Sequence, residues 1–375
     1  MKAESKPILT AQDRRTFLCR TAAAAAAFGI LRGRAFAQDR KARLKFAVIG
    51  INHEHIFRMV QAVRDGGGEL AMICDPDPDP THGAKFLREN AGVPLARDER
   101  EVLGAPDIAL VVSDALPAKR AQIGIRAMRA GKDVLADKGG FLNLEDLAEA
   151  RRVQAETKRI YSISFNERLL LPVSEKIDEL LQAGAIGRVT HMKGFGPHGL
   201  FGHGPREPWF WTRAGRGGIL LDIGAHQADQ FLHYVGAEGA EVVAAQTGNF
   251  ENADHPEFED YGHVAWRSKA GAGEATVTFY TGKDTTGFLL TLEGTDGRLE
   301  VQKRAGKITV IRRDGSRKEY RVDAKQPCPF GTRLVDDILN RTETAMPQAH
   351  AFLASELAVR AQLAAVRVNR KPEEM

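Results

Sequence analysis

The chain has 375 residues, of which 43% are hydrophobic, and a formal net charge of +4. This length exceeds one small core and indicates two domains. Residues 1–37 hold seven Lys or Arg and two acids, so the rest of the chain has a net charge of −1. This near-neutral charge excludes nucleic acid as an expected partner. Beyond residue 37 no apolar run is long enough to span a bilayer, and no membrane anchor is expected.

Residues 1–37 have the pattern of an export signal. The twin-arginine pair Arg14-Arg15 precedes an alanine-rich apolar stretch at 22–30, and a small-x-small cleavage pattern ends at Ala37. The sequence therefore predicts a twin-arginine signal peptide and a periplasmic or extracellular mature protein. The alternative is a cytosolic protein with an unstructured N-terminus. Because the twin-arginine route transports folded proteins, it suggests that a cofactor is bound, or an assembly completed, before export.

Short apolar runs alternate with helical patterns in the first half of the mature chain. Strands are expected at 44–50, 69–74, 107–112, 133–136 and 160–165, and helices at 56–63, 118–130 and 144–157. Strands that alternate with helices indicate a doubly wound parallel sheet. The fold class is therefore α/β, with a Rossmann dinucleotide-binding domain at 43–165.

The pattern changes after residue 166. A helix is expected at 173–183, and a region rich in Gly, His, Pro and Trp follows at 194–218. Strands are then expected at 241–246, 262–267, 274–280, 287–293, 298–301 and 308–312. Asp-Gly turns join several of them, as in antiparallel hairpins. These features predict an α+β domain at 166–346 with a mostly antiparallel sheet, and a C-terminal helix within 347–369 that packs back on the first domain.

A glycine turn between the first strand and the first helix is where a dinucleotide pyrophosphate binds. The chain has Gly50-Ile51-Asn52-His53-Glu54-His55 at this point. Gly50 can make the tight turn, but Asn52 and His55 replace the later small residues of the G-x-G-x-x-G/A pattern. The amide of Asn52 or the imidazole of His53 could donate to a phosphate. The turn is therefore a weakened but usable candidate for binding the cofactor.

Asp75 ends the second strand, where an acid binds ribose hydroxyls. An acid at this position favours NAD over NADP, because it repels a 2′-phosphate, although NADP stays open. The alternative is that Asp75 only forms the turn before Pro76.

The segment Gly217-Gly218-Ile219-Leu220-Leu221-Asp222-Ile223-Gly224-Ala225-His226 predicts a helix with an Asp and a His on one face. An Asp that faces a His can fix its tautomer and raise its basicity, which suits proton transfer near neutral pH. The alternative is a helix cap, in which Asp222 accepts from free backbone N–H groups and His226 faces water.

Taken together, these segments resemble the glucose–fructose oxidoreductase, inositol dehydrogenase and rhizopine-catabolism (Gfo/Idh/MocA) family. The resemblance covers nearly all of the mature chain. It rests on the strand before Gly50 with its turn, on the segments 130–138 and 184–189, and on the glycines and the Leu-Asp-Ile-Gly-Ala-His run within 217–226. It implies a Rossmann domain and an open-faced sheet domain, and a homo-oligomer that forms through that sheet.

The resemblance also implies oxidation of a secondary alcohol of a sugar or polyol, with NAD or NADP as hydride acceptor. The family's Glu-Lys-Pro lysine, which lies beside the nicotinamide and the substrate, matches Lys138, whereas Asp137 and Gly139 depart from the pattern. His226 is the candidate base and Asp222 its orienter. Lys138 would stabilise the developing alkoxide or exchange roles with His226. The alternative for Lys138 is an ordinary surface lysine.

Glycines and prolines predict a loop from residue 196 to residue 204, before the Pro-Trp-Phe-Trp segment at 208–211. The expected substrate-binding residues are His198, His203, Trp209, Trp211 and Arg213. The histidines would bind sugar hydroxyls, a Trp would stack on a sugar face unless both are core residues, and Arg213 could bind a carboxylate. The set His198, His203, Asp222 and His226 offers metal-ligand types at no recognised spacing, so no metal is expected.

Three functions remain open at this point. The first is a periplasmic sugar oxidoreductase that holds its nicotinamide cofactor tightly. The second is a redox-neutral glycoside hydrolase or lyase of the same family, which oxidises its sugar transiently. The third is a carbohydrate-binding protein with a degenerate cofactor turn and no activity. The first is preferred, because the residues assigned to proton transfer persist and only residues near the cofactor differ.

Overall fold

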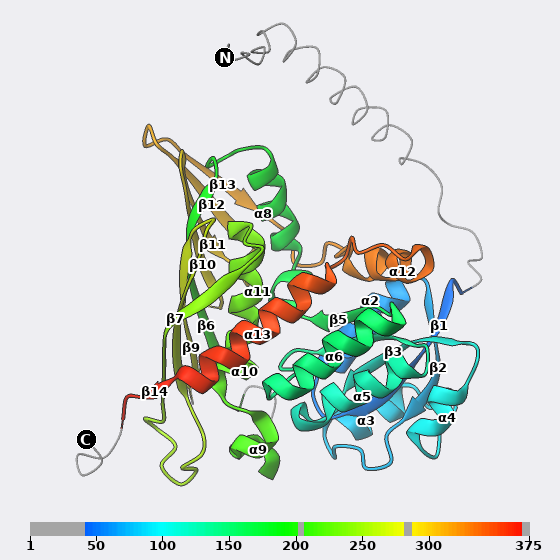
Figure 1. Ribbon diagram of the computed structural model, residues 1–375. Coiled ribbons are helices and arrows are strands. Elements are labelled where there is room, and N and C mark those ends of the chain that lie inside the picture. Colours follow the sequence, from blue (N-terminus) through cyan, green and yellow to red (C-terminus); the bar gives the residue numbers. More distant parts are fainter. Residues whose placement is uncertain (1–41, 202–205, 281–286, 370–375) are drawn as a thin grey trace, which may run out of the picture. The chain divides into compact units, whose positions relative to one another are not determined.

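The computed structural model describes residues 42–201, 206–280 and 287–369 (Figure 1). The expected export signal at 1–37 and the candidate ligand His203 lie outside the described residues. Within the described ranges, no helix combines the length and the apolar character that a membrane crossing needs.

The first sheet is parallel and has five strands in the order β2-β1-β3-β4-β5. The strands are β1 (Leu44–Ile51), β2 (Gly68–Cys74), β3 (Ile108–Asp114), β4 (Asp133–Asp137) and β5 (Tyr161–Ser164). The helices are α2 (His55–Asp65), α3 (His82–Glu89), α4 (Glu99–Gly104), α5 (Pro117–Arg129) and α6 (Leu144–Thr157). Every residue of β4 and β5 is buried, as expected for a sheet covered on both faces. The predicted Rossmann fold is confirmed.

The second sheet has nine strands in the order β13-β12-β11-β10-β6-β9-β8-β7-β14. They are β6 (Val189–Gly199), β7 (Ala240–Gly248), β8 (Tyr261–Ser268), β9 (Ala272–Tyr280), β10 (Leu289–Gly294), β11 (Gly297–Gln302), β12 (Lys307–Arg312), β13 (Arg317–Arg321) and β14 (Val366–Arg367). Only the β6–β9 and β7–β14 pairs are parallel, which confirms a mostly antiparallel sheet.

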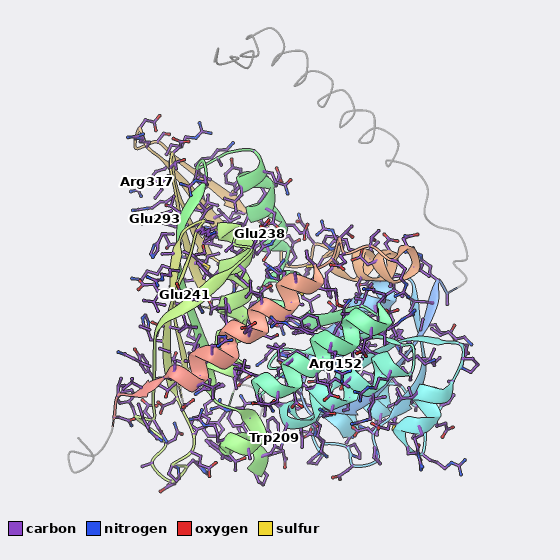
Figure 2. The ribbon with its side chains drawn as sticks, viewed as in Figure 1. Arg152, Trp209, Glu238, Glu241, Glu293 and Arg317 are labelled. Carbon is purple, nitrogen blue, oxygen red and sulfur yellow. The ribbon has the colours of Figure 1, made fainter. Side chains whose placement is uncertain are left out.

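Several helices lie between β5 and β7. They are α7 (Asn166–Leu169), α8 (Pro172–Gln182), the 3₁₀ turn η1 (Pro208–Trp211), α9 (Arg213–Arg216), α10 (Ile219–Asp222) and α11 (Gly224–Val235). Three of them, α8, α10 and α11, contact one face of the second sheet. Charged side chains such as Glu241, Glu293 and Arg317 project from the opposite face of that sheet (Figure 2). The sheet is therefore open on one side.

The segment 196–199, predicted as a loop, is the end of β6 and pairs with β9. The glycines of β6 face α11: a Cβ at Gly194 would lie 2.3 Å from Gln227 Oε1, and one at Gly196 would lie 3.1 Å from Gln227 Nε2. These glycines therefore serve close packing of helix on sheet rather than a turn. The prediction was wrong because a glycine in a strand and a glycine in a loop give the same local signal.

The last two helices contact both parts of the chain. Helix α12 (Phe330–Asn340) packs on α2, and α13 (Gln348–Ala364) packs on α10, α11 and β7 as well as on α6 and β5 (Figure 1). The side-chain Oε1 of Gln348 accepts a hydrogen bond of 2.7 Å from the backbone N–H of Tyr161. The C-terminal helix α13 therefore contacts elements of both domains.

Candidate active site

Gly50 closes a tight turn at the carboxyl end of β1. Its φ is +78°, and a Cβ there would lie 2.5 Å from the Cβ of Ala115. The backbone N–H of Asn52 donates to the carbonyl of Asp114 at 2.8 Å. The turn is thus held against the end of β3, and only glycine fits at its first position.

The N-terminus of α2 already faces a carboxylate of the protein. The N-cap residue Glu54 makes no side-chain cap, and the backbone N–H of Ile56 donates to Asp114 Oδ2 at 3.1 Å. Free N–H groups at a helix start attract anions. Asp114 therefore takes one of the positions that a phosphate oxygen would otherwise use.

Asp75 follows β2 directly, at the same edge of the sheet. Its Oδ2 is buried and has no hydrogen-bond partner among the described residues. Burial raises the pKa of this carboxyl to about 6. An unsatisfied carboxylate oxygen at this position matches the hydrogen-bonding needs of a ribose. Gly50 and Asp75 therefore fit a dinucleotide, even though the turn between them is atypical.

Two buried acids, Asp114 at the end of β3 and Asp137 at the end of β4, share one guanidinium. Arg120 Nη2 lies 3.0 Å from Asp114 Oδ1 and 3.2 Å from Asp137 Oδ2. His55 Nδ1 lies 2.9 Å from Asp137 Oδ1. Burial acts to raise the pKa of Asp137, but His55 and Arg120 hold it well below its usual range. Burial and the nearby Asp137 raise the pKa of Asp114 well above its usual range.

The sequence interpretation missed this carboxylate pair and Arg120. One signal could have found the acids, because each ends a strand of the parallel sheet, and the carboxyl ends of neighbouring parallel strands lie side by side.

Lys138 forms an ion pair with Asp222, although the two residues come from different domains. Lys138 follows β4 and is 6% exposed, and Asp222 is the last residue of α10. Arg216 Nη1 lies 3.5 Å from the other carboxylate oxygen of Asp222. Burial acts to raise the pKa of Asp222, but the cations of Lys138 and Arg216 lower it below its usual range. The lysine is therefore not an ordinary surface residue.

His226 is buried in α11, and its Nδ1 has no hydrogen-bond partner among the described residues. Burial, and then the charge of Lys138, lower its pKa well below 6.5. The ring is therefore neutral near neutral pH and close enough to Lys138 to be affected by its charge.

The expected contact between Asp222 and His226 is absent among the described residues, and this is a correction. The helix is interrupted at Ile223, and the backbone N–H of His226 donates to the carbonyl of Ile223, an i→i−3 bond. The i,i+4 alignment of an uninterrupted helix is therefore lost. Asp222 therefore orients the side chain of Lys138, and it does not orient the ring of His226.

His198 lies on β6, and its Nε2 is 3.6 Å from Glu167 Oε1. Gln227 and Gln230 donate to the other carboxylate oxygen of Glu167 at 2.9 and 3.2 Å. Burial raises the pKa of Glu167 to about 7 and lowers that of His198 to about 3. The sequence interpretation missed Glu167, which no local pattern distinguishes from a helix-start acid.

Two of the other expected substrate residues, Trp211 and Arg213, contact side chains of the protein itself. Trp211 stacks on His255 with ring centroids 3.8 Å apart. Arg213 Nη2 lies 2.6 Å from Glu259 Oε1, so a carboxylate of the chain already neutralises it. Trp209 is partly buried in the hydrophobic core and its indole Nε1 has no partner among the described residues.

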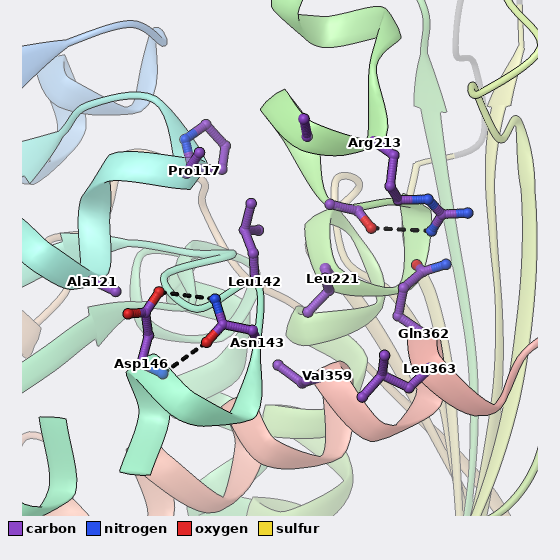
Figure 3. A pocket seen from close by; sticks show the side chains of 13 residues that line it. Pro117, Ala121, Leu142, Asn143, Asp146, Arg213, Leu221, Val359, Gln362 and Leu363 are labelled. Carbon is purple, nitrogen blue, oxygen red and sulfur yellow. Dashed lines mark hydrogen bonds between the residues drawn. The ribbon is translucent and has the colours of Figure 1, made fainter. Parts of the chain in front are cut away.

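A pocket of about 540 Å³ lies beside Leu221 of α10 (Figure 3). Its walls are formed mostly by apolar side chains, including Leu142, Leu221 and Val359, with Arg213 at its edge. The next residue after Leu221 is Asp222, which faces Lys138. Neither Lys138, Asp222 nor His226 lines the pocket.

A Rossmann sheet with a glycine turn after β1, an acid with one unpaired oxygen among the described residues after β2, and a lysine after β4 is typical of a dinucleotide-dependent oxidoreductase. Residues 44–165 match the oxidoreductase family with an NAD-binding Rossmann fold, and residues 174–300 match the GFO/IDH/MocA C-terminal domain. The chain therefore belongs to the Gfo/Idh/MocA family of oxidoreductases, and its cofactor is a nicotinamide dinucleotide.

Two relatives are named for activities on a sugar and on a polyol. A 1,5-anhydro-D-fructose reductase of Ensifer adhaerens is 28% identical over 79% of this chain and 84% of its own length. The scyllo-inositol 2-dehydrogenase (NAD(+)) of Bacillus subtilis is 25% identical over 73% of this chain and 78% of its own length. A crystal structure of a putative oxidoreductase from Erwinia carotovora atroseptica is 34% identical, with a TM-score of 0.82, and covers 87% of this chain and 99% of that one.

Proposed function

We propose that this protein transfers hydride between NAD and a secondary alcohol, or the matching ketone, of a sugar, polyol or sugar derivative. The sugar- and polyol-processing relatives support the substrate class. The observation that supports the chemistry most directly is the buried, unpaired Nδ1 of His226 near the charged Lys138. A buried nitrogen without a partner is costly, and a substrate hydroxyl would satisfy it.

The dinucleotide would be held by Gly50 and Asp75, with Asn52, His53 and His55 at the turn between them. The carboxylate of Asp75 would accept hydrogen bonds from the ribose and disfavour a 2′-phosphate. We therefore propose NAD as the preferred form. When bound, the nicotinamide accepts or donates the hydride, and the residues of the chain handle the proton.

Oxidation of an alcohol requires a base for its hydroxyl proton. His226 is neutral, so it can accept that proton, and in the reverse direction it returns the proton to the ketone oxygen. Lys138 donates a hydrogen bond to the same oxygen and stabilises the negative charge that develops on it. Asp222 and Arg216 limit the positions available to the lysine amine. His198, backed by Glu167, is our candidate to bind another hydroxyl of the substrate.

The first test is whether the purified protein binds a nicotinamide dinucleotide. We expect NADH fluorescence to change on binding, and mass spectrometry to detect a bound dinucleotide in protein from a host that can export it. Asp75→Ala should weaken NADH binding about tenfold, because a ribose hydrogen-bond partner is lost. Failure of both assays would overturn the cofactor assignment.

The second test is turnover on a panel of sugars and polyols that includes 1,5-anhydro-D-fructose and scyllo-inositol. On the best substrate, we expect Lys138→Met and His226→Gln each to lower kcat/KM by about 10²–10⁴-fold, with NADH affinity unchanged in His226→Gln. The exposed Lys85→Met is the matched control and should keep full activity. Full activity in either site variant would contradict the assigned roles.

A further inference from the structure

The turn after β1, where we place the dinucleotide, also contains a set of metal-ligand types. His53 and His55 lie two positions apart in this turn, and Asp137 ends β4. One ligand atom from each of the three side chains lies within 4.8 Å of the other two. We propose that His53, His55 and Asp137 bind one divalent transition-metal ion. This site differs from the His198, His203, Asp222 and His226 set that the sequence suggested as an alternative.

The spacing of the three groups suits a single ion. Zn–N and Zn–O bonds are about 2.0–2.2 Å long, so two ligand atoms at a tetrahedral angle lie roughly 3.3 Å apart. His55 Nδ1 and Asp137 Oδ1 lie 2.9 Å apart, close to that spacing. The rings of His53 and His55 have centroids 4.2 Å apart. A small rotation of either ring can therefore bring both nitrogens to one ion.

The chemistry of the set selects the class of ion. Two imidazoles and one carboxylate bind Zn²⁺, Fe²⁺, Mn²⁺ or Co²⁺, whereas Mg²⁺ and Ca²⁺ prefer oxygen ligands. With three protein ligands the ion would keep at least one open position.

The surroundings also hold the carboxylate ligand in place. Asp114 and Asp137 are buried and share the single guanidinium of Arg120. The next cation along the chain, Lys138, is paired with Asp222. Arg120, on the other oxygen of Asp137, would hold that ligand in place, as partners of ligating carboxylates do.

The test is direct titration of the protein, prepared without a polyhistidine tag and dialysed against a chelator, with Zn²⁺ and with Co²⁺. We expect one site by calorimetry and visible absorption bands when Co²⁺ is added. His53→Ala and His55→Ala should each weaken Zn²⁺ binding about tenfold or more. Mg²⁺ should show no binding at the same concentration.

A matched control is His233→Ala. His233 Nε2 lies 2.8 Å from Asp178 Oδ1, a His–Asp contact like that of His55, but it belongs to no three-ligand group among the described residues. This variant should bind Zn²⁺ as the unchanged protein does. Circular dichroism checks that all three variants fold.

Two outcomes would overturn the metal proposal. One is no binding of Zn²⁺ or Co²⁺ at micromolar concentrations by the unchanged protein. The other is wild-type affinity in both His53→Ala and His55→Ala, which would leave His55 and Asp137 as an ordinary hydrogen-bonded pair. NADH binding is measured separately on the same samples, so failure of the metal site and failure of the proposed oxidoreductase function are distinguishable.

Discussion

The position of the Lys138 side chain depends on the single negative charge of Asp222. The carboxylate of Asp222 faces two cations, Lys138 and Arg216, and both of these are buried. Removing one member of a buried ion pair leaves an uncompensated charge, which is more costly than removing the whole pair. Asp222 is therefore important for stability as well as for the position of the lysine amine.

We expect Asp222→Asn to lower the free energy of unfolding by about 3 kcal/mol and kcat/KM by roughly 10²-fold, because the lysine amine is no longer held. Urea denaturation and steady-state kinetics measure the two effects. The control is Asp178→Asn, which breaks a more exposed contact with His233 and should cost less than about 1 kcal/mol. Equal stability in the two variants would show that the Lys138–Asp222 pair is solvent-screened.

His226 links stability to pH. Its pKa is far below 6.5 in the folded protein because the ring is buried near Lys138, whereas the unfolded chain has the ordinary value of about 6.5. Below that pH the unfolded state binds a proton that the folded state does not, so stability is lost as pH falls.

From about pH 6 to about pH 5, we expect the wild type to lose roughly 1 kcal/mol more stability than His226→Gln, which has no proton to bind. Urea denaturation at these pH values and at about pH 7.5 measures the difference. Because all other titrating groups are common to both proteins, parallel curves would mean that His226 is protonated in the folded state.

At the level of elements, the packing of α11 on the second sheet depends on strand glycines. A Cβ at Gly273 would lie 2.5 Å from Cδ2 of Phe231 in α11. Any side chain there must displace a buried aromatic ring, and overpacking of this kind usually costs about 1–3 kcal/mol. The position of α11, the helix that contains His226, therefore depends partly on glycines of the second sheet.

We expect Gly273→Ala to lower the free energy of unfolding by about 1–3 kcal/mol, measured by urea denaturation. Gly239→Ala is the matched control, because nothing lies within 4 Å of its Cβ position, and its stability should change by less than about 0.5 kcal/mol. If both variants were equally stable, the Phe231 ring would have room to move, and the helix position would not depend on Gly273.

Across the whole molecule, the C-terminal segment connects the two domains. Arg341, just after α12, binds Asp133 at the start of β4 with two hydrogen bonds of 2.7 and 2.8 Å. Asp133 is completely buried, and α13 contacts elements of both domains. The described residues from 42 to 369 belong to one compact unit, so the two domains should unfold together.

We expect Arg341→Met to lower the free energy of unfolding by about 2 kcal/mol, because the buried Asp133 loses a charged partner while the arginine itself is partly solvated. All three tryptophans lie beyond residue 208, so their fluorescence reports the second domain. Its transition should shift together with that of far-UV circular dichroism, which reports both domains. Two separate transitions would contradict this coupling.

Much of the fold could be predicted from local patterns. The expected helix at 144–157 matches α6, and the expected strands at 44–50 and 69–74 match β1 and β2 to within one residue at each end. These elements have a strong period or a continuous apolar run, because they are buried in a regular way. Strand β6 was missed in part, since its glycines serve packing against α11.

The sequence by itself determined the Rossmann and α+β domains, and it predicted Lys138, Asp222 and His226 as site residues, because apolar periodicity and short motifs are local properties. Only the tertiary structure decided their partners. Lys138 and Asp222 are 84 positions apart, and His55 and Asp137 are 82 apart. Such pairings depend on how strand ends and helix starts from different elements converge, and no pattern along one element records that convergence.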